Sequence, residues 1–148
     1  MIVVGLGNPG KKYEQTRHNV GFLVLDCLAE KLNASWKTKA SWSSQVAEIS
    51  LNEKKVVLLK PETFMNLSGN AVARARGFWR KTPIDQIWVI HDDVDLELGD
   101  IRIKKGGSSA GHRGINSIDN KLGSADYHRI RVGVGRPDNS KIPIDKFV

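Results

Sequence analysis

The sequence predicts a single α/β domain in which a mixed central β-sheet carries helices on both faces. Short apolar runs typical of strands interleave with segments whose apolar residues recur at helical spacing. The 148 residues have the length of one ordinary domain, and a hydrophobic content of 40% is enough to build a core. No repeat or low-complexity linker divides the chain, so residues 1–148 are expected to form one domain.

The first half of the chain contains three predicted strands and two predicted helices. The run Ile2-Val3-Val4, ended by Gly5, is typical of a buried strand, and the polar stretch that follows it is typical of a loop. Two alternating segments flank the turn Asn52-Glu53 and predict a hairpin. The predicted order is a strand at 2–4, a loop over 5–18, a helix over 19–32, strands at 42–50 and 55–59, and a helix over 67–80.

The second half contains three more predicted strands and one more helix. Residues 87–90 are continuously apolar, which favours a central strand, whereas residues 101–104 alternate like a strand with one solvent-facing side. The Gly/Ser-rich residues 105–111 predict a loop, and Gly123 is a suitable end for a helix over 113–122. Residues 130–134 alternate again and predict the last strand.

The composition limits the classes of partner and compartment. The net charge of +7 is uneven, with +2 in residues 1–99 and +5 in residues 100–148. A basic stretch attracts nucleic-acid backbones, although basic surface that only aids solubility is an equal alternative. The single cysteine, Cys27, lies among apolar residues at helical spacing and is expected to be a buried hydrophobe rather than a nucleophile. With no apolar run of membrane-spanning length and no signal peptide, the expected compartment is the cytoplasm.

Polar side chains follow several of the predicted strands, where ligands gather in an open α/β sheet. Asn8 and His18 lie in the loop after the first strand, and His91-Asp92-Asp93 follows the central strand. Two further segments, 64–66 and 106–114, open helices. We expect these four segments to converge on one cleft.

His18 is the candidate general base, and Asp92 is its candidate partner. A lone histidine is more often structural, but His18 stands at a junction of loop and helix rather than on an apolar face. A carboxylate at the end of a buried strand can accept a hydrogen bond from one imidazole nitrogen and raise the basicity of the other. Residues 108–112 could pair a serine with a histidine, but their glycines favour a backbone cradle for a phosphate or carbonyl. We therefore expect the His–Asp pair to activate water directly.

Two other kinds of site are less well supported. Residues 5–10 fit the G-x-G-x-x-G dinucleotide pattern, but helical periodicity begins only near residue 19, too late for a helix start to meet a pyrophosphate. The carboxylates of residues 92–95 could form a metal cluster, yet strand alternation sends Asp92 and Asp93 to opposite faces. We therefore expect neither a metal nor a cofactor.

Two asparagines and two apolar residues are candidates for substrate contacts. Asn8 and Asn66 each offer an uncharged donor and acceptor that can orient water, a carbonyl oxygen or a ribose hydroxyl. The structural alternatives are a turn role for Asn8 and a helix N-cap role for Asn66. Phe64 and Met65 fit either a core or the apolar wall of a substrate groove.

Taken together, these segments resemble bacterial peptidyl-tRNA hydrolase in order, spacing and residue identity along nearly the whole chain. The matching pieces are VGLGNPG at 4–10, Tyr13, TRHN at 16–19, KPETFMNLSG at 60–69, HDDVDL at 91–96, GGSSAGH at 106–112 and RIRVGVGRP at 129–137. No single piece is decisive, but the set is highly specific.

The resemblance implies a metal-free esterase with a single α/β domain, usually monomeric and without a cofactor. It implies that His18 acts as general base on water, that Asp92 orients it, and that the two amides position substrate and water. The expected substrate-binding residues are Asn8, Tyr13, Phe64, Met65, Asn66, His112 and Arg113. The implied substrate is peptidyl-tRNA released prematurely from ribosomes, which yields a free peptide and reusable tRNA, and no membrane partner is implied.

Two departures from the family pattern bear on the site. Arg113 stands where the family often has an asparagine that helps organise the cleft. The chain ends at Val148, where family members usually continue through helices that help cover the cleft and add basic surface. A domain over 1–148 that lacks those helices is expected to expose apolar surface or to bind tRNA more weakly.

The main alternative function is a hydrolase-like RNA-binding module with little catalysis, of the type that serves organelle splicing. The presence of both amides, His18 and Asp92 favours an enzyme over such a module. A dinucleotide-dependent enzyme depends on the match at residues 5–10 alone.

Overall fold

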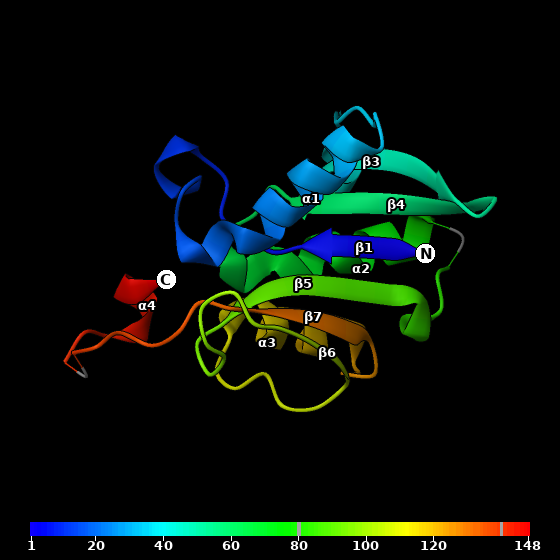
Figure 1. The fold of residues 1–148 in the computed structure, drawn as a ribbon. Helices are drawn as coiled ribbons and strands as arrows, with labels where there is room; N and C mark the ends of the chain where they lie inside the picture. Colours follow the sequence, from blue (N-terminus) through cyan, green and yellow to red (C-terminus); the bar gives the residue numbers. More distant parts are fainter. Residues whose placement is uncertain (80, 140) are drawn as a thin grey trace.

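A mixed seven-stranded sheet forms the centre of the computed structural model, which describes residues 1–79, 81–139 and 141–148. Within these residues the strand order across the sheet is β2-β3-β4-β1-β5-β7-β6 (Figure 1). Strands β4, β1, β5 and β7 run parallel to one another, whereas β2, β3 and β6 pair antiparallel with their neighbours. The strands are β1 Ile2–Gly5, β2 Lys37–Lys39, β3 Ser44–Leu51, β4 Lys54–Pro61, β5 Ile87–Asp93, β6 Ile101–Lys105 and β7 His128–Gly133.

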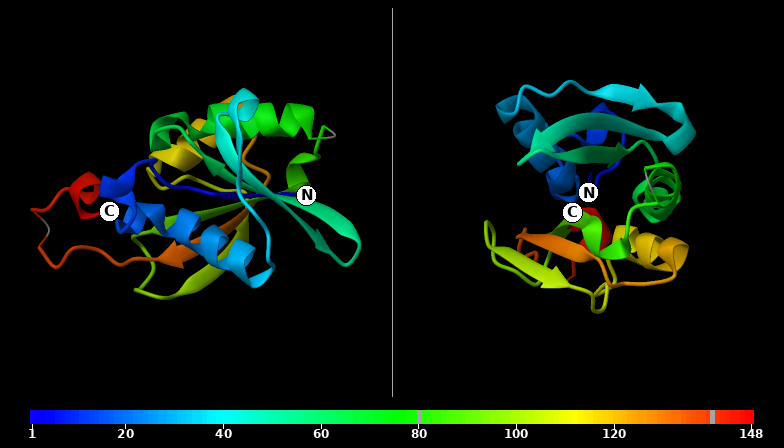
Figure 2. Two further views of the ribbon diagram at one scale, coloured as in Figure 1. Left: turned by 90° about the horizontal axis from the view of Figure 1, so that it is seen from above. Right: turned by 90° about the vertical axis from the view of Figure 1, so that its right-hand side faces the viewer.

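Helices cover both faces of the sheet, as the sequence predicts. Helix α1 (Val20–Lys31) packs on one face, while α2 (Ser68–Phe78) and α3 (Arg113–Leu122) lie side by side on the other (Figure 2, right). Two apolar clusters fill the two interfaces, one around Leu25 of α1 and the other around Val72 of α2 and Ile118 of α3. None of the helices in the described part of the chain is long and apolar enough to span a membrane.

Several element boundaries differ from the sequence prediction. Strand β2 is wholly exposed and consists of Lys-Thr-Lys, so it carries no hydrophobic signal that a pattern could detect. The short helix α4 (Ile144–Phe147) is also unpredicted, and β5 extends through Asp93. The predicted helix over 67–80 begins at Ser68 and ends at Phe78, and its last predicted residue, 80, lies outside the described residues.

The prediction that Cys27 is buried is wrong, because its side chain is exposed. The buried residues of α1 are Gly21, Leu25 and Ala29, which recur every four residues along one stripe. Cys27 lies two residues from Leu25 and therefore about 200° around the helix from that stripe.

A close approach between two glycines brings the start of α1 to the carboxyl end of β1. A Cβ on Gly21 would lie 2.3 Å from the Leu6 nitrogen, and a Cβ on Gly5 would lie 2.3 Å from the Gly21 oxygen. Only glycine permits such contact between backbones. Gly5 is thus needed for packing, and α1 begins at Val20 rather than within residues 5–10, which argues against the dinucleotide alternative.

The parallel strands end at one edge of the sheet, and the segments that follow them meet there. The one-turn 3₁₀ helix at Arg17–Asn19 directly precedes α1 at this edge. Helix α4 lies beside it, where the His18 N–H donates to the Val148 oxygen at 3.0 Å (Figure 2, left). The four predicted segments therefore converge, and α4 adds a fifth.

Candidate active site

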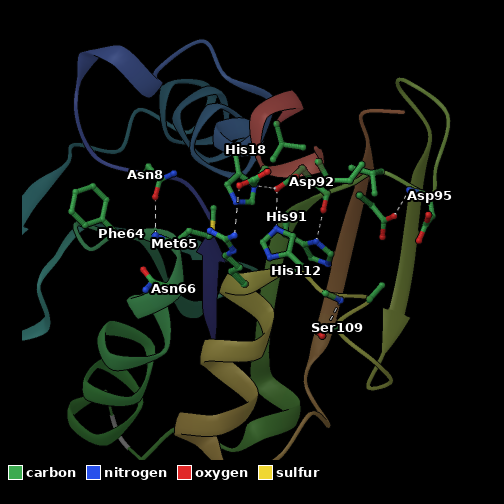
Figure 3. A pocket seen from close by; sticks show the side chains of 18 residues that line it. Asn8, His18, Phe64, Met65, Asn66, His91, Asp92, Asp95, Ser109 and His112 are labelled. Carbon is green, nitrogen blue, oxygen red and sulfur yellow. Dashed lines mark hydrogen bonds and ion pairs between the residues drawn. The ribbon is translucent and has the colours of Figure 1, made fainter. Parts of the chain in front are cut away.

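A cleft of about 640 Å³ opens at the carboxyl edge of the sheet. It is lined by Asn8, His18, residues 64–66, 91–95 and 109–113, and by three residues of the C-terminal segment, Ile144, Asp145 and Val148. Figure 3 shows His18, Asp92 and His112 pointing toward one another in this cleft, with Asn8, Phe64, Met65 and Asn66 on one side of them.

The contact expected between His18 and Asp92 is present. The His18 Nδ1 lies 2.8 Å from the Asp92 Oδ1, and the Asp92 side chain is only 4% exposed. Burial by itself would raise the pKa of Asp92, but hydrogen bonds from His112 and His18 hold it well below its usual value. Asp92 is therefore ionised and can only accept, so His18 carries its proton on Nδ1 and keeps the Nε2 lone pair available.

His112 makes a second hydrogen bond to the same oxygen of Asp92. Its Nε2 lies 2.9 Å from the Asp92 Oδ1, while its Nδ1 accepts from the backbone N–H groups of Gly114 and Ile115 at 3.1 and 3.3 Å. His112 is therefore the N-cap of α3. A nitrogen that accepts two N–H groups has no proton, so the proton of His112 must sit on Nε2.

Among the described residues, His18, Asp92 and His112 form the cluster that could hold a metal ion, since their ligand atoms lie within 4.8 Å of one another. Coordination would require the His112 Nε2 to give up its proton. A neutral imidazole would then be protonated on Nδ1, which accepts the two N–H groups that start α3. This donor set is poorly suited to a resident cation.

The neighbouring carboxylates are already paired with arginines. The Asp93 Oδ2 accepts from the Arg131 Nε at 2.6 Å, and the Asp95 Oδ1 accepts from the Arg136 Nη2 at 2.5 Å. Asp93 thus turns away from Asp92, as strand alternation predicts, and these residues do not form a shared cation cluster.

The side-chain amide of Asn8 is oriented by its neighbours. Its Oδ1 accepts from the Met65 N–H at 2.8 Å, which leaves the Asn8 Nδ2 as the free donor on the cleft wall (Figure 3). Asn19 holds the backbone of Asn8 on both sides, because its Oδ1 accepts from the Asn8 N–H and its Nδ2 donates to the Asn8 oxygen. Sequence reasoning missed Asn19, which it took for the first residue of a helix.

Asn66 and Phe64 lie exposed on the same wall. The N-cap alternative for Asn66 is wrong, because α2 begins at Ser68 and Leu67 occupies its N-cap position without a side-chain bond. Phe64 is 57% exposed, whereas Met65 is 4% exposed and belongs to the core as well as to the cleft wall.

The remaining predicted residues, Arg113 and Tyr13, differ in their positions. Arg113 lines the cleft, and its side chain lies 3.7 Å from the Asp145 carboxylate of α4. Tyr13, in the 3₁₀ turn Lys11–Tyr13, is not among the residues that line the cleft.

Two buried basic residues shape the cleft: His91, which the sequence placed in a converging segment without assigning it a role, and Arg129, which sequence reasoning missed. His91 is 4% exposed, its Nδ1 donates to the Asp92 backbone oxygen at 2.7 Å, and burial together with the nearby His112 lowers its pKa to about 4. Arg129 is 2% exposed and donates to the backbone oxygens of Gly107 and Ser108, each at 2.8 Å. Arg129 thereby ties down the glycine-rich loop that leads into His112.

The serines of that loop are engaged with the backbone. The Ser108 and Ser109 hydroxyls accept from the N–H groups of Ala110 and Gly111 at 3.2 and 3.3 Å. His112 uses both of its ring nitrogens elsewhere, so this geometry does not support a Ser–His nucleophile.

Comparisons with known proteins agree with one another. The family model described as peptidyl-tRNA hydrolase matches residues 2–148. Peptidyl-tRNA hydrolase of Rickettsia bellii is 48% identical over 141 residues, covering 95% of this chain and 75% of the relative. The Rickettsia peacockii enzyme is 46% identical over 95% of this chain and 76% of its own length. A crystal structure of the Acinetobacter baumannii peptidyl-tRNA hydrolase superimposes with a TM-score of 0.88 at 34% identity, covering 98% of this chain and 78% of that one.

Proposed function

Because this chain belongs to the peptidyl-tRNA hydrolase family and hydrolyses the ester between peptide and tRNA, we propose that His18 and Asp92 perform this hydrolysis on a water molecule. The observation that carries the proposal is the hydrogen bond between the His18 Nδ1 and the Asp92 Oδ1 at 2.8 Å. It fixes the tautomer in which the His18 Nε2 is a free base.

The chemistry follows from that tautomer. The His18 Nε2 takes a proton from water as the oxygen attacks the ester carbonyl carbon, and Asp92 stabilises the imidazolium that forms. When the bond between that carbon and the ribose oxygen breaks, the imidazolium returns the proton to the ribose oxygen. The products are a peptide with a free carboxyl group and tRNA with a free terminal hydroxyl.

The amides and the apolar wall are proposed to hold the substrate. The Asn8 Nδ2 is the donor best placed to stabilise charge on the ester oxygen, since its Oδ1 is occupied by the Met65 N–H. Asn66 and Phe64 are exposed on the same wall and can contact the ribose and the peptide. His112 and Arg113 also line the cleft, and Tyr13 is proposed only for parts of the substrate that extend beyond it.

Basic residues near the cleft are proposed to contact the tRNA backbone. Strand pairing sets Lys104 opposite Arg129 and Arg102 opposite Arg131, and directly opposed residues share one face of a sheet. Lys104 extends along Gly107 in the loop that leads to the cleft, and Arg113 lines the cleft itself. Arg129 is buried and occupied by the loop, so the phosphate contacts are proposed for the exposed Arg102, Lys104 and Arg113, and the affinity that they supply depends on salt.

We also propose that the protein works as a monomer in the cytoplasm. The proposed catalytic pair and both amides meet in one cleft of a single chain, which supports catalysis by a monomer. The cytoplasm is where ribosomes release the substrate. The alternative of an RNA-binding module with little catalysis is not favoured, because the catalytic pair and both amides are present.

Single-turnover cleavage of a peptidyl-tRNA by four proteins tests the mechanism. His18→Ala should lower the rate by roughly 10²–10⁴-fold, which is the usual contribution of a general base. Asp92→Asn should lower kcat with little change in KM, and the double variant should be barely slower than His18→Ala because the two residues act as one unit. Multiplicative losses would show that Asp92 acts independently, and near-normal activity of His18→Ala would end the mechanism.

A further inference from the structure

His112 contacts two different parts of the molecule through its two ring nitrogens. Its Nδ1 caps α3, and its Nε2 meets the Asp92 oxygen that His18 also uses. We propose that His112 is a positioning residue that lowers the basicity of His18 by competing for this shared oxygen. The proposal rests on the proposed function, in which His18 is the base.

The backbone of α3 fixes the proton of His112 on Nε2. The Nδ1 accepts from Gly114 at 3.1 Å and from Ile115 at 3.3 Å, and both donors are helix N–H groups that would otherwise lack a partner. A proton on Nδ1 would remove the acceptor of the cap and place the Nδ1–H group against the N–H groups of Gly114 and Ile115. His112 therefore directs its Nε2 N–H at Asp92, and because the cap occupies its Nδ1 lone pair it cannot replace His18 as the base.

A single carboxylate oxygen thus accepts two imidazole N–H groups. The distances from the Asp92 Oδ1 to the His18 Nδ1 and the His112 Nε2 are 2.8 and 2.9 Å, and the two rings are 5.0 Å apart. A close carboxylate favours the imidazolium form of a histidine. The N–H of His112 offsets part of that carboxylate charge, so Asp92 stabilises the imidazolium form of His18 less than an unshared carboxylate would.

The other charged groups around the cleft are engaged elsewhere. On β5 and the segment after it, Asp93 and Asp95 are paired with Arg131 and Arg136, and His91 is kept neutral by burial. On the α4 side, Asp145 lies 3.7 Å from Arg113 of α3.

Two further groups lie near His18: the side chain of Arg17, its neighbour in the chain, and the backbone oxygen of Val148 in the C-terminal segment. The Arg17 guanidinium lies over the Phe147 ring at 4.3 Å, and the Val148 oxygen accepts the backbone N–H of His18. Neither contact involves the His18 ring, so Asp92 and His112 remain the groups in direct hydrogen-bond contact with the imidazole pair.

Two substitutions separate the two contacts of His112. His112→Asn keeps an acceptor near the position of Nδ1, and asparagine is a preferred N-cap, but its short amide does not reach Asp92. His112→Gln carries an amide N–H near the position of Nε2 and loses the cap. Each variant is therefore the control for the other.

The measurement is the titration of the His18 ring by NMR, with the His18→Ala spectrum identifying its signal. The pH profile of kcat/KM is recorded in parallel because its acid limb reports the base in the free enzyme. For His112→Asn we expect the His18 midpoint and the acid limb to rise together by roughly 0.5–1 pH unit, a fraction of the range that a close carboxylate produces. For His112→Gln we expect both to stay at their wild-type values while the urea denaturation midpoint falls.

An unchanged His18 midpoint in His112→Asn would overturn the proposal, even if the rate fell, because it would leave His112 a merely structural role. Equal shifts in both variants would also overturn it, since loss of the cap would then be the cause. Full activity of His18→Ala would instead end the proposed function, and the NMR titration would still decide the coupling between the two histidines.

Discussion

Lowering the pH is expected to destabilise the fold through His91 before the carboxylates titrate. His91 is 4% exposed, and burial, with a smaller contribution from His112, lowers its pKa from 6.5 to about 4. His91 therefore takes up a proton below about pH 6.5 in the unfolded chain, but only below about pH 4 in the folded protein. Stability is therefore lost as the pH falls through this window. Asp92 acts in the same direction only below it, because its pKa is already depressed in the folded protein.

The size of the loss follows from the two pKa values of His91. The difference between them corresponds to about 3 kcal/mol when complete, of which about 2 kcal/mol is lost between pH 7 and pH 4.5. A loss of this size is a large fraction of the stability of an ordinary domain.

Urea unfolding of the wild type and of His91→Asn at pH 7, 6, 5 and 4.5 tests this reasoning. The variant lacks the imidazole, so its free energy of unfolding should fall by about 2 kcal/mol less than that of the wild type between pH 7 and 4.5. The comparison uses each protein's own value at pH 7, which removes the cost of the substitution itself. Parallel pH profiles would refute the assignment of the acid loss to His91.

Three further outcomes are expected. Hydrolysis should continue in the presence of a chelator, because the imidazole nitrogens that face Asp92 carry protons and therefore cannot act as metal ligands; loss of activity that a divalent ion restores would refute the water-plus-imidazole mechanism. The affinity for tRNA should fall linearly with salt on a log–log plot, and charge reversal at Lys104, Lys105 and Arg113 should lower the affinity and make this slope shallower, because fewer phosphates are contacted; a flat salt response in a filter-binding or fluorescence assay, or unchanged affinity after charge reversal at all three positions, would contradict these phosphate contacts. Gly69→Ala should reduce the free energy of unfolding by about 1–3 kcal/mol, because the new Cβ would lie 2.0 Å from the Ser117 oxygen between α2 and α3; an unchanged urea midpoint would show that the two helices separate freely.

The sequence was informative wherever burial repeats along one element. The continuous run at 87–90 identified β5 as an interior strand of the sheet, and the spacing of apolar residues identified α1, α2 and α3. The same patterns failed for the exposed strand β2 and for Cys27, because neither takes part in a repeating buried stripe. Such patterns indicate which face of an element packs against the core, and they carry no information about an element that does not pack against a core.

By itself, then, the sequence determined the fold class, the segments that carry polar groups and the choice of His18 and Asp92 as a pair. Only the tertiary structure decided how those groups share hydrogen bonds. His18 and Asp92 are 74 positions apart, and their contact depends on β1 lying beside β5 and on two glycines that let α1 approach β1. Three other hydrogen-bonded contacts also form only because the fold brings distant segments together. They join His112 to Asp92, Asn19 to Asn8, and Arg129 to the glycine-rich loop. A hydrogen bond needs atoms within about 3 Å and a suitable angle, and periodicity along a chain does not specify distances between segments that meet only in the folded state.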